Sequence, residues 1–262
     1  MYLEKRNIKG FTLVELSIVI VLIGLIVAGV VGGQVLVNQA KLRGLIADIN
    51  KYELAINAFR LEYGAYPGDF DKANDFGLGA SGNGDKQLTD HDSFPEAAWF
   101  LPHMSNAGLI EGPYTTALPY SNGHSLQIGK NKLKINYSDN VSFYVHYTGH
   151  GASVKAPTHN HSWTPNGLYQ NWYGNALEVG AVDTPAGFPE GAGRGWLGFL
   201  SVKDAQSIDS KMDDGEPGMG RLVVTGPHAT NACTDKQITQ ALPVAFDFTD
   251  TTKRCRLFYS LM

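Results

Sequence analysis

The most prominent pattern in the sequence is an uninterrupted apolar run near its start. Residues 16–33 carry no charged side chain, and extending the run back to Phe11 gives 23 residues in which Glu15 is the only ionisable group. A helix that crosses a bilayer needs about 20 mainly apolar residues. The sequence therefore predicts a transmembrane segment over about residues 11–33.

After this run the apolar positions recur at steps of three and four, which is the spacing of an amphipathic helix with one apolar stripe. No proline interrupts residues 11–66, and Gly64 followed by Pro67 is a helix-ending signal. We therefore expect one helix over residues 11–64, about 53 residues or about 80 Å long at 1.5 Å per residue. The stripe consists of Leu42, Leu45, Ile46, Ile49, Tyr52, Ile56, Phe59 and Tyr63.

Charge is distributed unevenly along the chain. Lys5, Arg6 and Lys9 outweigh Glu4 in residues 1–10, which carry +2, whereas the whole chain carries −4 and the remainder therefore −6. Basic residues before an apolar span favour a cytoplasmic N-terminus and an exported body. The acidic balance does not fit a nucleic-acid-binding protein, so no nucleic acid is expected as a partner.

Two simpler interpretations compete for this start. An ordinary secretory signal peptide has an apolar region of about 7–15 residues followed by a small-residue cleavage site, and the run here is longer. A plain membrane anchor leaves Glu15 unexplained, because a carboxylate inside an apolar span is costly and marks a candidate functional residue.

The segment Lys9-Gly10-Phe11-Thr12-Leu13-Val14-Glu15 resembles the type IV prepilin signature: a basic leader, glycine, phenylalanine, and glutamate at the fifth mature position. The apolar helix and its amphipathic extension are similar to those of type IV pilins and type II secretion pseudopilins. This resemblance covers about the first 70 residues. It implies an α+β fold, in which the long N-terminal helix packs on a loop-rich antiparallel β-sheet.

The resemblance also implies a processing and assembly route. A prepilin peptidase would cut between Gly10 and Phe11, leaving a cytoplasmic leader of residues 1–10, and Phe11 would be N-methylated. Glu15 would pair with the Phe11 amine of a neighbouring subunit, because an unpaired carboxylate in a low dielectric is costly. The other implied partners are further pilin or pseudopilin subunits, an inner-membrane assembly platform and membrane lipid. The protein would sit in the bacterial inner membrane and then in a periplasmic or cell-surface filament.

Residues 65–262 would form the periplasmic domain. The many glycines and prolines there predict short elements joined by loops. Alternating or apolar runs predict the strands, and 196–201 is either a buried strand or a turn. The expected helices are one that begins at 96 and ends at Gly108 and one over 204–212, and the expected strands are 132–137, 141–147, 196–201 and 220–224.

Two segments of the body are candidate calcium sites. The loop 67–95 is rich in oxygen donors but lacks EF-hand spacing, so a solvated loop with Asn and Gly turns is the alternative. Asp209, Asp213 and Asp214 form the second candidate, since a C-terminal calcium site is known among major pseudopilins; here we favour an Asp-Gly turn that leads into a strand. No other cofactor is expected. The donors of the loop are Asp69, Asp71, Asn74, Asp75, Asn83 and Asp85.

Other functional classes leave weaker traces. Four histidines could contribute to a zinc enzyme, but no His-Glu-x-x-His helix, phosphate-binding glycine loop or Gly-x-Ser-x-Gly elbow is present. We therefore expect no enzyme. The aromatic loop Trp163–Trp172 suggests an alternative, a membrane-anchored surface-binding protein or tip adhesin. Cys233 and Cys255 are the only cysteines, and in an exported protein they are expected to form a disulfide. The histidines are His146, His150, His159 and His161.

As a mature chain of about 252 residues, the protein is larger than most major pilins. Its size therefore favours a minor pilin or pseudopilin.

Overall fold

The structure is a computed structural model, and several segments of the chain lie outside its description. The chain divides into two compact units at the Arg43–Gly44 boundary, and each unit is described by itself. The described residues are 10–88, 96–115, 128–130, 132–147, 174–181, 197–226, 233–235, 243–249, 251–252 and 254–261.

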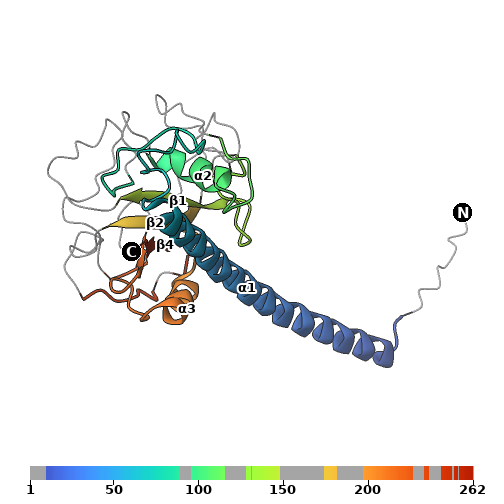
Figure 1. Ribbon diagram of the computed structural model, residues 1–262. Helices are drawn as coiled ribbons and strands as arrows, with labels where there is room; N and C mark the ends of the chain where they lie inside the picture. Colours follow the sequence, from blue (N-terminus) through green and yellow to red (C-terminus); the bar gives the residue numbers. More distant parts are fainter. Residues whose placement is uncertain are drawn as a thin grey trace, which may run out of the picture. The chain divides into compact units, whose positions relative to one another are not determined.

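Helix α1 runs without interruption from Leu13 to Tyr63 (Figure 1), so the single long helix expected from the sequence is confirmed. It ends where the sequence signals, because Gly64 adopts a left-handed conformation with φ of 71° and its amide donates to the Arg60 carbonyl at 2.9 Å. Glycine takes this conformation without the steric cost that a side chain would add.

Within its described residues, the body contains an antiparallel four-stranded sheet in the order β1-β2-β4-β3. The α+β class is therefore confirmed. Leu177 of β2 lies opposite Val145 of β1 on one side and Tyr259 of β4 on the other, so β2 and β4 occupy the centre. The strands are β1 (Val141–Tyr147), β2 (Asn175–Ala181), β3 (Leu222–Thr225) and β4 (Arg256–Ser260).

The described part of the body also contains two short helices. α2 spans Glu96–Asn106 and lies next to β1, whereas α3 spans Val202–Met212 and lies next to β3. Ser201 caps α3, since its side-chain oxygen accepts a hydrogen bond from the Asp204 amide. Both helices occupy the places expected from the sequence.

The part of α1 that belongs to the body contributes a stripe of buried side chains to the core. Leu45, Ile49, Ile56 and Phe59 are at most 1% exposed, and Tyr52 packs edge-on against Phe143 of β1 with ring centroids 5.2 Å apart. The apolar spacing of the sequence thus identifies the face that is buried.

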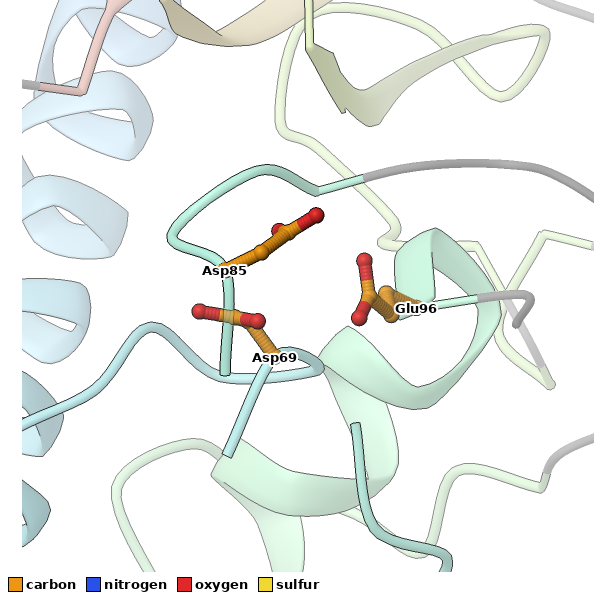
Figure 2. Close-up of side chains that lie close together, drawn as sticks. All are labelled: Asp69, Asp85 and Glu96. Atoms are coloured by element: carbon orange, nitrogen blue, oxygen red, sulfur yellow. The ribbon is translucent and has the colours of Figure 1, made fainter. Parts of the chain in front are cut away.

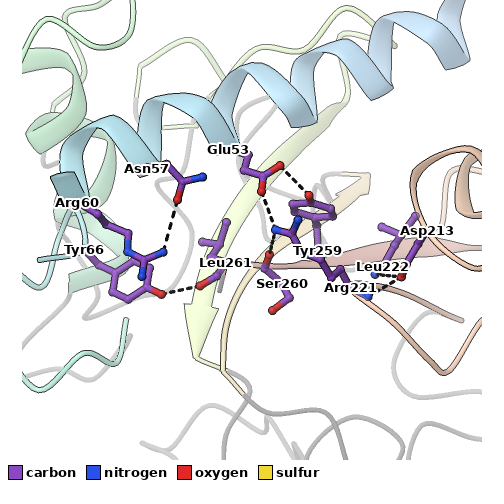
Figure 3. A network of polar contacts seen from close by, with 10 residues as sticks. All are labelled: Glu53, Asn57, Arg60, Tyr66, Asp213, Arg221, Leu222, Tyr259, Ser260 and Leu261. Atoms are coloured by element: carbon purple, nitrogen blue, oxygen red, sulfur yellow. Dashed lines mark hydrogen bonds and ion pairs between the residues drawn. The ribbon is translucent and has the colours of Figure 1, made fainter.

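A polar network joins the same helix to β4 and to the residue before β3 (Figure 3). Arg221 Nη2 lies 2.6 Å from Glu53 Oε1, and the Tyr259 hydroxyl donates to Glu53 Oε2 at 2.7 Å. Near the helix end the Tyr66 hydroxyl donates to the Leu261 carbonyl at 2.6 Å. These contacts connect α1 to residues that lie late in the chain.

The expected strand over 132–137 is wrong. Leu133, Ile135 and Tyr137 are buried and alternate with exposed positions, but the segment does not join the described sheet. Its backbone is held by side chains instead. The Asn136 amide donates to Asp48 of α1 at 2.7 Å, and the Ser142 hydroxyl donates to the Leu133 carbonyl at 2.8 Å.

Of the segment expected over 196–201, residues 197–201 are described. They form isolated bridges rather than a strand, with Leu197 opposite Ala181 and Leu200 opposite Cys255. The sequence analysis also missed β2 and β4, the two central strands of the sheet.

Candidate functional site

The predicted processing site lies directly before α1. Gly10 and Phe11 are exposed, and Phe11 retains 87% of its exposure. A Cβ built at Gly10 would meet no atom within 4 Å, so the local fold does not itself require glycine at this position. Residues 1–9, which contain the rest of the predicted leader, lie outside the described residues.

Glu15 closes a capping box at the start of α1. Its carboxylate accepts hydrogen bonds from the Thr12 amide at 2.8 Å and from the Thr12 hydroxyl at 2.9 Å, and the Thr12 hydroxyl accepts from the Glu15 amide at 3.2 Å. Thr-x-x-Glu is the sequence form of this motif, and it satisfies amides that the first helical turn leaves without partners. The sequence analysis missed this second role of Glu15, although the spacing signals it.

The first half of α1 has the length and composition of a membrane-spanning helix. Its most apolar window has a mean hydropathy of 2.8, and none of that window is buried within the protein. Apolar side chains are exposed on successive positions, including Ile18, Val19, Ile20 and Val21. Side chains exposed around the whole helix fit an apolar surrounding supplied by lipid or by other helices.

The three acidic residues predicted at the end of α3 lie together. One carboxylate oxygen from each of Asp209, Asp213 and Asp214 falls within 4.8 Å of the others. Asp209 is fully buried, and neither of its carboxylate oxygens has a hydrogen-bond partner. Burial, followed by the charges of Asp214 and Asp213, raises the pKa of Asp209 to about 7. The Gly215 amide opposes this rise, although it falls short of a hydrogen bond.

The same segment also forms the turn expected from the sequence. Asp213 Oδ2 accepts hydrogen bonds from the amides of Arg221 and Leu222, at the start of β3 (Figure 3). Asp214 Oδ1 accepts from the Glu216 amide at 2.8 Å, which is an Asx turn, and Gly215 has a φ of 82°. Asp213 and Asp214 therefore have structural roles, whereas Asp209 is the carboxylate that the turn does not use.

The structure brings together a second acidic cluster, Asp69, Asp85 and Glu96, within the same 4.8 Å limit. Asp69 and Asp85 are among the donors predicted for the loop, whereas Glu96, the first residue of α2, was not predicted as a ligand. Asp71, Asn74 and Asp75 are exposed, and the acids Asp71 and Asp75 are not members of the cluster.

The structure joins Cys233 and Cys255 in a disulfide with their Cα atoms 5.2 Å apart. Both residues are fully buried, and the Cys255 segment pairs with Leu200. The link ties the segment after β3 to the start of β4, as expected for an exported chain.

The other candidates fall largely outside the described residues. Of the four histidines considered as zinc ligands, His146 is a backbone member of β1, and His150, His159 and His161 are not described. The aromatic loop Trp163–Trp172, considered as a binding surface, is not described either.

Comparison with known proteins identifies one feature. The family model described as the prokaryotic N-terminal methylation motif matches residues 5–31. This motif is the signature of type IV prepilins and pseudopilins, and the match covers the Gly10–Phe11 junction, Glu15 and most of the apolar run. The N-terminal segment of the chain thus carries the signature of type IV prepilins and pseudopilins. Neither the curated proteins nor the solved structures contain a significant match.

Proposed function

We propose that this protein is a structural, non-enzymatic filament subunit, a minor pilin or pseudopilin of a type IV pilus or a type II secretion system. The observation that carries the proposal is the methylation motif at the head of a 51-residue helix whose first half is apolar and exposed. Such a helix needs an apolar surrounding on all sides, and lipid before assembly and neighbouring subunits after assembly would both supply it.

Processing would convert the membrane-anchored chain into an assembly-competent subunit. A prepilin peptidase cuts between Gly10 and Phe11 at the cytoplasmic face, and Phe11 is then N-methylated. Removing residues 1–10 removes the basic head but leaves the apolar helix in the bilayer. An inner-membrane assembly platform then moves the subunit into the filament, with the body on the periplasmic side.

Glu15 would set the register between subunits. In the uncut chain its carboxylate is satisfied by Thr12. After cleavage, the amine of Phe11 on a neighbouring subunit offers a positive partner, and a charged pair is far less costly in a low dielectric than a lone carboxylate. A subunit displaced along the filament would leave both charges without partners.

Mass spectrometry of the N-terminus tests the proposal directly. Membrane fractions from cells with and without prepilin peptidase are compared, and the expected product is a peptidase-dependent N-terminus at methylated Phe11. Gly10→Val should block cleavage without disturbing the fold, because a side chain at Gly10 meets no neighbour. Gly24→Ala is the matched control, since Gly24 is equally open.

Assembly is tested separately with Glu15→Gln. This variant should be cut and methylated normally but should enter filaments poorly, and Ser17→Ala, a polar deletion on the same turn of helix, should enter normally. A chain that retains Met1, or one cut after Gly33, would contradict the prepilin route and leave a plain anchor or a secretory signal in its place.

We further propose that Asp209, Asp213 and Asp214 hold a structural calcium ion. The supporting observation is the buried Asp209 carboxylate, which has no hydrogen-bond partner and faces two other acids. Carboxylate oxygens are the ligands that Ca²⁺ prefers. Calorimetric titration of the full chain in detergent should show one Ca²⁺ fewer per chain for Asp209→Asn than for the wild type. Asp204→Asn, on the same helix, should keep the wild-type number.

A further inference from the structure

Three segments of the body approach one another beside the first turn of α2. A Cβ at Gly82 would lie 2.5 Å from the Cα of Asp69, and a Cβ at Gly68 would lie 2.3 Å from the Glu96 carbonyl oxygen. Real Cβ atoms do not come so close to backbone, so glycine is what permits both approaches. Backbone bonds fix the arrangement, since the Gly84 amide donates to the Asp69 carbonyl at 3.0 Å.

The close backbone approaches at Gly68 and Gly82 bring three acidic side chains together. The side chains of Asp69, Asp85 and Glu96 converge on one space, with an oxygen of each within 4.8 Å of the others (Figure 2). Asp69 is 1% exposed and Glu96 is fully buried, whereas Asp85 is exposed. The cluster is therefore closed on the protein side and open to solvent at Asp85.

One oxygen in this cluster lacks a partner. Asp69 Oδ2 accepts a hydrogen bond from the Lys86 amide at 2.9 Å, but Asp69 Oδ1 is buried and accepts none. Burial, followed by the charge of Glu96, raises the pKa of Asp69 to about 6. A buried carboxylate oxygen without a hydrogen bond is costly, and a bound cation is one of the few ligands that relieve the cost.

His103, which lies beside the cluster, does not supply that positive charge. Burial lowers the pKa of His103, and its ring already bonds on both sides. Nδ1 accepts from the Gly68 amide at 2.8 Å, which leaves Nε2 to donate to the Ala80 carbonyl at 2.7 Å. Glu96 Oε1 accepts from the Asn83 amide at 3.0 Å. Asn83 and His103 thus hold the loop in place around the acids.

We propose that Asp69, Asp85 and Glu96 bind a hard divalent cation, and that Ca²⁺ is the cation this set suits. All three ligands are carboxylates, and the solvent-facing side at Asp85 leaves room for water molecules to complete a coordination number of about six to eight. Mg²⁺ fits less well because it requires near-ideal octahedral geometry and gives up its water reluctantly. The bound ion cross-links the loop after α1 to α2. This site is separate from the Asp209 cluster and does not depend on the filament role.

The test uses the full chain in detergent, freed of metal with EDTA and titrated with Ca²⁺ by calorimetry. All variants carry Asp209→Asn, so that the other acidic cluster does not contribute. This background should bind one Ca²⁺ per chain. Adding Asp69→Asn, Asp85→Asn or Glu96→Gln should weaken binding by at least about tenfold, because each removes one charged ligand.

Asp75→Asn is the matched control, since Asp75 is an exposed acid of the same loop outside the cluster, and it should leave binding unchanged. Asp85 is exposed, so Asp85→Asn remains informative even if a variant at buried Asp69 fails to fold. Absence of Ca²⁺ binding in the Asp209→Asn background, or binding that Asp85→Asn and Glu96→Gln leave unchanged, would overturn the proposal. Binding of Mg²⁺ with no binding of Ca²⁺ would overturn the choice of cation.

Discussion

Arg221 and Glu53 lie 168 residues apart in sequence, yet Nη2 of Arg221 is 2.6 Å from Oε1 of Glu53. Arg221 also stacks over the ring of Tyr259 with 4.8 Å between the guanidinium carbon and the ring centroid, and the Tyr259 hydroxyl donates to the same Glu53 carboxylate. The three side chains form a closed polar unit that joins α1 to the segment before β3 and to β4.

A double-mutant cycle measures the coupling free energy between Glu53 and Arg221. Glu53→Gln and Arg221→Gln, alone and together, should give a coupling free energy of about 1 kcal/mol in urea unfolding, because the pair is only partly buried. The matched pair is Lys134–Asp139, which is 3.2 Å apart but largely exposed. Its coupling should stay below about 0.5 kcal/mol. Equal couplings in the two cycles would show that burial does not strengthen the Arg221 contact.

Arg256 and Glu178 form an ion pair that is buried, in contrast to the two pairs above. Arg256 Nη1 lies 2.8 Å from Glu178 Oε1, and its Nε donates to the Gly226 carbonyl at 3.0 Å. Arg256→Met should lower the free energy of unfolding by about 3–5 kcal/mol, since it removes the hydrogen-bonded cation of the buried Glu178 carboxylate, on which the charge of Lys132 also acts. Arg256→Lys keeps the charge but loses the paired geometry, so its cost should be intermediate. A loss below 1 kcal/mol for Arg256→Met would mean that Glu178 finds another partner.

The buried Asp209 carboxylate predicts a specific pH dependence in metal-free protein. Its pKa rises from an ordinary value of 3.8 to about 7 because of burial and the nearby Asp214 and Asp213. The folded state therefore binds the proton more tightly than the unfolded state does. The stability from this group is complete below about pH 4 and is lost as the pH rises through about 7.

Melting temperatures measured in EDTA between these pH values should fall less for Asp209→Asn than for the wild type. Because other buried acids titrate in the same window, the difference between the two proteins is the quantity to compare. Ca²⁺ should flatten the wild-type profile, since a bound cation keeps the carboxylate ionised. Parallel profiles in EDTA would contradict the burial of a titrating Asp209.

The Cys233–Cys255 disulfide closes a loop with a sequence separation of 22. Replacing both cysteines with serine should cost about 3 kcal/mol, by the chain entropy that the cross-link removes from the unfolded state. Chemical unfolding of the oxidised protein and of the double variant measures the difference. Because both cysteines are fully buried, a reductant should act on the native wild type only slowly. Rapid reduction under native conditions would contradict that burial.

The long helix and its buried face could be predicted because the pattern that encodes them is local. Steps of three and four identify Leu45, Ile49, Ile56 and Phe59 as buried positions. The helix ends at Gly64, whose left-handed conformation depends on no distant residue. β1 was found for the same reason, since seven residues alternate without a break.

The central strands β2 and β4 were not predicted from the sequence, because their stability comes from the neighbouring strands of the sheet. β2 reads Asn-Ala-Leu-Glu-Val-Gly-Ala, with few residues that favour strands, and is buried along its whole length between β1 and β4. The segment 132–137 has the better strand pattern, yet its Asn136 amide donates a hydrogen bond to Asp48 of α1 instead of to a neighbouring strand. Tertiary contacts overrode propensity in both directions.

The candidate sites also differ in whether their residues are close together in the sequence. The Gly10–Phe11 junction and Glu15 lie within one short motif and could be read directly. The Asp69 cluster could not, because Glu96 is 27 positions from Asp69 and reaches it only through the close approaches at Gly68 and Gly82. The same loop contains other acids, Asp71 and Asp75, that the sequence does not distinguish from Asp69 and Asp85, and only the fold shows which acids meet Glu96.

The strand order has a consequence for the timing of folding. β3 pairs only with β4 in the described sheet, and β2 pairs with β4 on one side, yet β4 is the last of the four strands in the chain. Until Arg256–Ser260 emerges, β3 has no partner to join and the sheet lacks its second central strand. A body exported behind an N-terminus that stays in the cytoplasm would therefore keep its sheet incomplete during translocation, and would complete it only when β4 had crossed the membrane.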